Sequence, residues 1–586
     1  MNNARRSRAL TKHSSRRNAA IVFALAQSLA AGALAQSKAT IATSAVRVAP
    51  LTEATVLTAK PIKLPAFCPP PDGTRPEPTL VNTDAFVLKR FPLARVYKQL
   101  IDLSGLAAPS VTELYQQMWD ALDKSGNAKF AGPHCDDNAS TINGFPIDCP
   151  RPETVLKDTL PESFTPVALF NRFDLTPSDG SICGEYRIVY AFGGAVGGGD
   201  PYPGGPKLPT PLPIEVIQPI KTTSATLAST SAVVATSRIV PTRPLPVPIT
   251  VNGRNFIIFE GILPNPDPTC GVEACRPVVE FWEKLASFDP GTAAGQTALA
   301  DGLENFYFNG LSGFEPVVHP NHYGVKGGGG YGQRSGGQIR TNMFIQNQEW
   351  QLREFHLRPN CDKTGKCSKL LLDPVTVKTN PHHELFNLAA FAPDPRAPAF
   401  QAAFPSEAQA LATDSVAKIG MNIADQFNAG QSTSQDFNED YGFQFSLGSP
   451  PNPFSAAIDS ELVSIARTDL TATDIVNRAT TQSCAGCHQL SNGKPLGGKV
   501  NPQWPFSRGF VHVDEASNLS QALWCVFLPD RKTVLDGFFS SPDVECGPRD
   551  LPLKPIVILP PQERIETVPD VAPAILSVSG KIVGPN

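Results

Sequence analysis

The stretch Tyr186-Arg187-Ile188-Val189-Tyr190-Ala191-Phe192 is rich in β-branched and aromatic residues, a composition typical of a β-strand. Residues 166–170 and 255–263 have the same character, and residues 342–357 show the pattern of a hairpin. The sequence therefore predicts a large mixed domain over residues 81–380, with a mostly antiparallel β-sheet.

Charged side chains stand in or beside these apolar stretches, namely Arg172, Asp174, Glu185 and Arg187. Charged groups in apolar surroundings usually pair with one another. We expect them to form a structural ion-pair network rather than a ligand site.

A glycine-rich run begins at Gly193 and leads into a stretch rich in Pro, Thr, Ser and Ala. This composition predicts a flexible insertion near residues 193–250, between two paired strands. The run lacks the Gly-Lys-Ser/Thr sequence of a phosphate-binding loop.

Helical spacing of apolar residues occurs at 111–119, where Ser110 or Thr112 could cap the helix, and around 278–285. After Pro381 this spacing dominates. Expected helices are one from His382 to about residue 391, one that begins with a capping box at Ser406-Glu407-Ala408-Gln409 and ends at Gly430, one at 456–467 and one at 473–480. The expected fold class is α+β.

The N-terminus has the pattern of a secretory signal peptide over residues 1–35. A basic segment is followed by an apolar run from Ala19 that ends in Ala33-Leu34-Ala35. No other apolar run is long enough for a membrane span. We therefore expect an exported protein, periplasmic or secreted.

The sequence predicts the following organisation: a signal peptide at 1–35, an irregular leader at 36–80, the mixed domain at 81–380, a helical region at 381–530 and a C-terminal extension at 531–586. The formal net charge of −4 includes six positive side chains within residues 1–35, so the remainder carries about −10. This balance does not suggest binding to nucleic acid or to an anionic membrane surface.

Ten of the twelve cysteines lie outside one C-x-x-C motif, an even number that suits five disulfides in an exported protein. Proximity in sequence favours the following pairs: Cys135/Cys149, Cys270/Cys275, Cys361/Cys367 and Cys525/Cys546, with Cys68/Cys183 left over.

The remaining two cysteines belong to Cys484-Ala485-Gly486-Cys487-His488. The pattern C-x-x-C-H attaches c-type haem: the two thiols bind the vinyl groups and the adjacent imidazole binds the iron. A disulfide loop is the structural alternative. A redox dithiol is a further alternative, but it would require a thioredoxin-like βαβ context, which the sequence does not show.

Residues 484–488 resemble the haem motif of c-type cytochromes, with a helical surround from about 382 to 530. The resemblance implies one covalent haem c, bound through Cys484 and Cys487, with His488 as the proximal iron ligand. Such small cytochromes usually have a downstream Met as the second ligand, whereas the four methionines here precede the motif. His512 could replace it, Met421 or another upstream residue could reach back, or the sixth position is open.

The sequence leaves three functions open, two with haem and one without it. The first is electron transfer with a redox partner protein, and the second is a haem-dependent oxidoreductase with an open sixth site, for which His356, His382 and His383 are the weak distal candidates. The third is a disulfide-rich secreted binding protein without haem. His319 and His322 could ligate a metal, but Pro320 argues against one shared helical face, so no metal is expected there.

Overall fold

The computed structural model describes residues 76–107, 109–119, 141–148, 156, 159–193, 254–324, 337–344, 350–387, 394–434, 440–447 and 452–540. All of them lie in the compact unit that follows Leu64. The expected signal peptide, most of the leader, the insertion after Gly193 and the extension beyond residue 540 lie outside the described residues, so these predictions remain untested.

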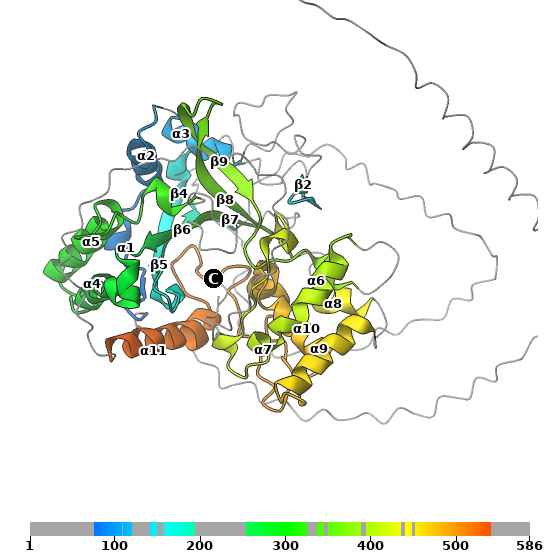
Figure 1. The fold of residues 1–586 in the computed structure, drawn as a ribbon. Helices are drawn as coiled ribbons and strands as arrows, with labels where there is room; N and C mark the ends of the chain where they lie inside the picture. Colours follow the sequence, from blue (N-terminus) through cyan, green and yellow to red (C-terminus); the bar gives the residue numbers. More distant parts are fainter. Residues whose placement is uncertain are drawn as a thin grey trace, which may run out of the picture. The chain divides into compact units, whose positions relative to one another are not determined.

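The centre of the described structure is an antiparallel sheet in the order β1-β4-β5-β6-β7-β8-β10, with β9 paired to β8 (Figure 1). Its strands are β1 (Val81–Asn82), β4 (Phe164–Arg172), β5 (Ile182–Phe192), β6 (Asn255–Pro264), β7 (Gln338–Phe344), β8 (Trp350–Cys361), β9 (Cys367–Val375) and β10 (Ser432–Thr433). A separate hairpin consists of β2 (Thr141–Ile142) and β3 (Phe145–Pro146). The predicted α+β class with an antiparallel sheet is confirmed.

The α-helices are α1 (Ala85–Leu88), α2 (Leu93–Ser104), α3 (Val111–Gln117), α4 (Arg276–Ala286), α5 (Ala293–Phe308), α6 (Ala397–Ala403), α7 (Ala408–Leu411), α8 (Tyr441–Ser446), α9 (Pro453–Ser464), α10 (Ala472–Thr480) and α11 (Leu528–Phe539). The predicted helices at 111–119, 278–285, 456–467 and 473–480 are confirmed as α3, α4, α9 and α10. Ser110 caps α3 through a capping box with Glu113. Within the described part of the chain, no helix is both long and apolar enough to cross a bilayer.

One face of the sheet, which we call the helical face, packs against α2, α4 and α5. Tyr186 of β5 stacks on Trp282 of α4 and meets Phe306 of α5 edge to face, with ring centroids 6.1 and 4.9 Å apart. Phe259 of β6 meets Tyr97 of α2 at 5.6 Å. Aromatic contacts of this kind bury much apolar area, so this face forms the main core.

The opposite face, which we call the charged face, carries a row of ion pairs that crosses four strands. Arg187 on β5 lies opposite Glu260 on β6, and Arg340 on β7 lies opposite Glu354 on β8. Arg187 pairs with Glu185 at 2.6 Å and with Glu260 at 3.3 Å. Arg340 pairs with Glu260 at 3.2 Å and with Glu354 at 2.6 Å.

These charged side chains are buried, and the partners of each one stabilise its ionised form. Burial alone would raise the pKa of Glu185, but Arg187 and neighbouring cations hold it at about 2. Arg172 likewise pairs with Asp174 at 2.9 Å. The predicted pairing of the charged residues within the strands is therefore confirmed, and the row extends further across the sheet than the sequence suggested.

The disulfides differ in part from the predicted pairs. Cys361 and Cys367 are bonded as expected. Cys183, however, is bonded to Cys275, so the predicted pairs Cys270/Cys275 and Cys68/Cys183 are wrong. Antiparallel pairing sets Pro264 of β6 opposite Ile182 of β5, and the turn that follows β6 carries Cys275 to Cys183. Cys135, Cys149 and Cys546 lie outside the described residues.

Two predicted helices are largely absent from the described structure. From His382 to Asn387 the chain forms only a 3₁₀ turn, His383–Phe386, and residues 388–391 of the predicted helix lie outside the described residues. The carbonyls of Leu385 and Asn387 accept hydrogen bonds from the Gln401 amide at 3.0 and 3.2 Å. Because those carbonyls are bound by a side chain, the backbone leaves the helical path.

The second prediction, a helix from Ser406 to Gly430, is confirmed only for the four residues of α7. Ser406 donates to the carbonyl of Ala403 instead of capping a helix. Beyond α7, Arg478 donates to the carbonyls of Leu411 and Thr413, and Arg467 to that of Ala412. Because these carbonyls accept side-chain hydrogen bonds, they do not accept the backbone hydrogen bonds that would continue the helix.

Arg478 is fully buried and also donates to the carbonyl of Leu496 at 2.7 Å. Replacing it with methionine, of similar length, removes every one of these donors and leaves buried carbonyls unsatisfied. We expect Arg478→Met to lose roughly 3 kcal/mol of unfolding free energy, measured by urea denaturation. The exposed Lys98→Met is the control, since Lys98 pairs with Asp102 at the surface. If Arg478→Met and Lys98→Met lost equal unfolding free energy, the role assigned to Arg478 beyond the end of α7 would be contradicted.

Candidate functional site

The motif 484–488 follows α10 directly and is held in a short helical turn. A capping box between Thr471 and Asp474 starts α10, and Gly486–Leu490 is a π-helical segment. A Cβ atom on Gly486 would lie 1.6 Å from the carbonyl oxygen of Thr480. Only glycine fits there, so one of the two residues between the cysteines is fixed by a close backbone approach.

Hydrogen bonds join this turn to the sheet. The backbone amide of Ala485 donates to the hydroxyl of Ser432 on β10 at 3.0 Å. The amide of Cys484 donates to the side-chain carbonyl of Asn380 at 3.3 Å. The motif is thereby attached to β10, which pairs with β8.

His488 is buried, and its hydrogen bonds define its tautomer. Its Nδ1 lies 2.9 Å from the carbonyl oxygen of Phe510. Because a carbonyl only accepts, Nδ1 carries the proton and Nε2 has a free lone pair. This Nε2 is buried and has no hydrogen-bond partner among the described residues. Burial lowers the pKa of His488 to about 4, so the ring is neutral at pH 7.

Asn342 supports the same carbonyl from β7. Its amide donates to Phe510 at 3.2 Å, and its oxygen accepts from the indole of Trp350 at 2.5 Å. A metal-binding histidine typically donates its second nitrogen to a backbone carbonyl in this way. His488 therefore has the tautomer and orientation of a metal ligand.

His512 lies next to His488, with ring centroids 4.7 Å apart. Its Nε2 is 3.1 Å from the sulfur of Cys487, and its Nδ1 is 2.9 Å from the hydroxyl of Ser520. Burial, reinforced by His488, lowers the pKa of His512 well below its usual value. The two histidines singled out from the sequence thus meet at one place.

A small pocket opens at these two rings. Its walls come from the charged face of the sheet and from the segment that follows the motif: Phe170, Arg187, Val189, Phe256, Ile258, Asn342, His488, Val511, His512, Val513, Leu523 and Arg531. Most of these side chains are apolar, and the polar groups are two histidines, two arginines and one amide. Such a lining suits a largely apolar ligand with a few fixed polar contacts.

Arg531 of α11 is a buried cation whose charge is only partly compensated by its neighbours. It is buried, and its Nη2 has no hydrogen-bond partner among the described residues. Asp174 lies 4.0 Å from its Nε, and burial, reinforced by Arg172, lowers the pKa of Arg531 well below its usual value. An anionic group of a bound ligand, such as a carboxylate, would compensate this buried cation.

Both motif cysteines are free and buried. Cys484 packs with Trp350, Leu352 and Val377, and burial raises its pKa to about 12. Burial also raises the pKa of Cys487 well above its usual value. Neither thiol lines the pocket, although Cys487 reaches its edge through His512. The two thiols are not joined to each other, in contrast to the disulfide alternative.

Other residues considered from the sequence lie elsewhere. Met421, His356, His382 and His383 do not line the pocket. The sequence analysis missed Arg531 and Asn342, because neither carries a local motif that would mark it.

We expect both motif thiols to resist thiol reagents in folded, haem-free protein, since each is buried with a raised pKa. With 5,5′-dithiobis(2-nitrobenzoic acid) at pH 8, the number of reactive thiols should be the same in the native wild type, Cys484→Ser and Cys487→Ser. After unfolding without reductant, each variant should show one thiol fewer than the wild type.

The matched control is Cys361→Ser, which frees the half-buried Cys367 from its disulfide. That variant should show one additional reactive thiol while folded. Rapid labelling of Cys484 or Cys487 in the native protein would contradict the burial described here.

Comparison of this chain with models of protein families, with curated proteins and with solved structures found no match.

Proposed function

We propose that this chain is an exported c-type haem protein that takes part in electron transfer. One haem would be bound covalently through Cys484 and Cys487 in the C-x-x-C-H motif. The observation that carries the proposal is His488: its Nδ1 proton is bound by the Phe510 carbonyl, and its buried Nε2 has no hydrogen-bond partner in the described part of the chain.

Several residues around His488 suit such a group, whereas neither Cys484 nor Cys487 lines the pocket, so covalent attachment would require both thiols to turn toward it. The pocket offers apolar walls, and Arg531 offers a buried cation for a carboxylate. Asn342 and Phe510 fix the His488 ring, while Ser520 fixes that of His512. Haem in this place would supply one-electron chemistry, whose potential the axial ligands and the burial of the site would adjust.

The walls of the pocket suggest why the chain is much longer than a small electron carrier. Phe170, Val189 and Ile258 come from three strands of the sheet, and each lines the pocket. A second candidate function follows from this arrangement: a haem-dependent oxidoreductase whose sheet shapes a substrate space beside an open sixth position. The presence of Arg187 and Arg531 on the pocket wall favours an anionic substrate in that case.

We also propose a periplasmic or secreted location. The disulfides Cys183–Cys275 and Cys361–Cys367 suit an oxidising compartment. The N-terminal signal pattern and the attachment of c-type haem outside the bacterial cytoplasm agree with that location.

The haem proposal predicts a coloured protein. Produced with haem-maturation machinery and extracted with acid acetone, the wild type should retain its colour and give a c-type pyridine haemochrome spectrum with about one haem per chain. Cys484→Ser/Cys487→Ser should lose the covalent haem, because both thioether sulfurs are absent.

The matched control is Cys361→Ser/Cys367→Ser, which also removes two cysteines but leaves the motif intact. It should keep the haem content of the wild type. A colourless wild type, or equal haem in the motif variant, would rule the proposal out.

His512 decides between the two redox functions. We expect a six-coordinate, low-spin spectrum that carbon monoxide does not alter, because His512 lines the same pocket as His488. His512→Ala should then become high-spin and bind carbon monoxide, while the buried Met421→Leu should behave as the wild type. A wild type that already binds carbon monoxide would favour the oxidoreductase instead.

A further inference from the structure

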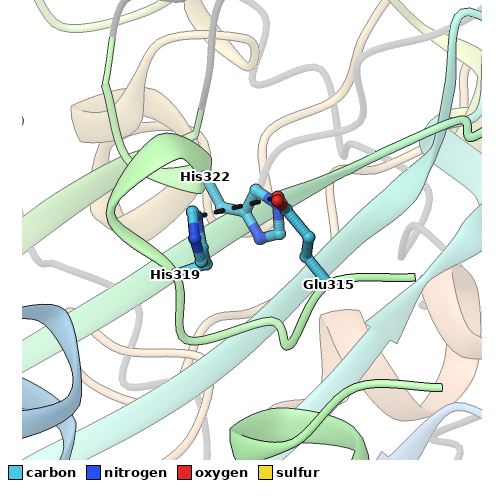
Figure 2. A group of neighbouring side chains, drawn as sticks. All are labelled: Glu315, His319 and His322. Carbon is cyan, nitrogen blue, oxygen red and sulfur yellow. Dashed lines mark ion pairs between the residues drawn. The ribbon is translucent and has the colours of Figure 1, made fainter. Parts of the chain in front are cut away.

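A second group of ligand-type side chains lies away from the cysteine motif, at Glu315, His319 and His322 (Figure 2). One potential ligand atom of each residue lies within 4.8 Å of the others. His319 directly precedes the 3₁₀ turn Pro320–His322, His322 is the last residue of that turn, and Glu315 lies earlier in the segment after α5. None of the three lines the pocket at His488.

His322 is prepared to accept a metal ion. It is fully buried, and its Nδ1 lies 3.2 Å from the carbonyl oxygen of Val317. Because the carbonyl only accepts, Nδ1 donates the hydrogen bond, and in the neutral ring Nε2 is the nitrogen with the lone pair. That Nε2 has no hydrogen-bond partner among the described residues and lies 3.4 Å from the carboxylate of Glu315. A metal-bound histidine typically has this second contact to a carbonyl.

His319 is brought to the same place by the turn. Proline is favoured at the first position of a helical turn, and side chains three residues apart eclipse one another in a 3₁₀ turn. The ring centroids of His319 and His322 are accordingly 5.2 Å apart. Pro320, which argued against a shared α-helical face, is thus the residue that starts the turn that joins them.

His319 is also buried, with 2% of its surface exposed. Its Nδ1 lies 3.7 Å from the Glu315 carboxylate and accepts a 3.3 Å hydrogen bond from the amide of Asn321. Its Nε2 has no hydrogen-bond partner among the described residues. The His319 atom that faces Glu315 is Nδ1, so a metal ion bound there would replace the 3.3 Å hydrogen bond from Asn321. A buried imidazole nitrogen without a partner is costly unless a further group binds it.

The separations suit a small tetrahedral ion. Metal bonds of about 2.0–2.1 Å with tetrahedral angles place neighbouring ligand atoms about 3.4 Å apart. The two histidine–carboxylate distances are 3.4 and 3.7 Å. The ligand atoms of His319 and His322 lie within 4.8 Å of each other, so side-chain rotations that bring the two rings closer would complete a three-ligand site.

We propose that Glu315, His319 and His322 bind a divalent transition-metal ion of the zinc class. Two imidazoles and one carboxylate are a typical zinc donor set, whereas Ca²⁺ and Mg²⁺ prefer oxygen ligands. Three protein ligands leave a fourth position for water. The carboxylate is 35% exposed while both rings are buried, so the ion reaches the site from the surface on the side of Glu315.

The backbone around the site is fixed before any metal binds. The amide of Val318 donates to the carbonyl of Tyr307 on α5 at 2.9 Å, and the amide of Gly337 donates to the carbonyl of His322 at 2.7 Å. A Cβ atom on Gly337 would lie 1.7 Å from the carbonyl oxygen of Glu260. The turn is therefore held between α5 and the start of β7, so metal binding should stabilise the fold.

The test uses the full chain without an affinity tag, stripped with a chelator and dialysed against a low concentration of zinc chloride. Atomic spectrometry should find about one more zinc per chain in the wild type than in His322→Gln or His319→Gln. The wild type should also gain thermal stability with zinc, and these two variants should not.

Glu315→Gln keeps the size of the side chain and removes its charge, so it tests the site in a variant that is expected to fold. It should bind zinc at least tenfold more weakly than the wild type. His356→Gln changes a buried histidine on β8 outside the cluster and should bind as the wild type does. Equal zinc content in the wild type and all cluster variants, or no zinc in the wild type, would overturn the proposal.

Discussion

The described structure depends on an antiparallel sheet that is buried on both faces. Aromatic packing stabilises one face, and ion pairs stabilise the other. On the helical face, aromatic side chains pack into a dry core. On the charged face, Arg187, Glu260 and Arg340 are paired across adjacent strands. Removing one member of such a row would leave a buried charge without its partner, which costs far more than the pair itself contributes. A segment that packs against the charged face must therefore leave these ion pairs intact.

The segment that contains His488, His512 and Arg531 packs against the charged face, and the motif 484–488 is part of this segment. The sheet supplies Arg187 and Asn342 to the pocket, and the C-terminal segment supplies His488, His512 and Arg531. The candidate haem site is consequently not confined to the short stretch that resembles a cytochrome. Its walls, the buried cation Arg531 and the contact that orients His488 all come from residues far apart in the sequence.

Much of the sheet and several helices could be predicted, because strands such as Tyr186–Phe192 and helices such as α3 carry strong local patterns. The helix expected from Ser406 to Gly430 failed for a reason that no local pattern contains: Arg478 binds its carbonyls from a distant helix. The disulfide from Cys183 to Cys275 likewise depends on strand pairing rather than on proximity in sequence. Motif residues were recognisable by their spacing, whereas Arg531 and the Glu315 cluster became visible only in three dimensions.

The central claim is that haem is attached at one place in this chain, beside His488. Peptide mapping by mass spectrometry tests it most directly, on protein produced with haem-maturation machinery and digested under conditions that preserve thioether bonds. The account predicts that the peptide containing Cys484 and Cys487 is heavier by one haem and that no other peptide is. An unmodified motif peptide, or one whose two cysteines form a disulfide, would contradict it.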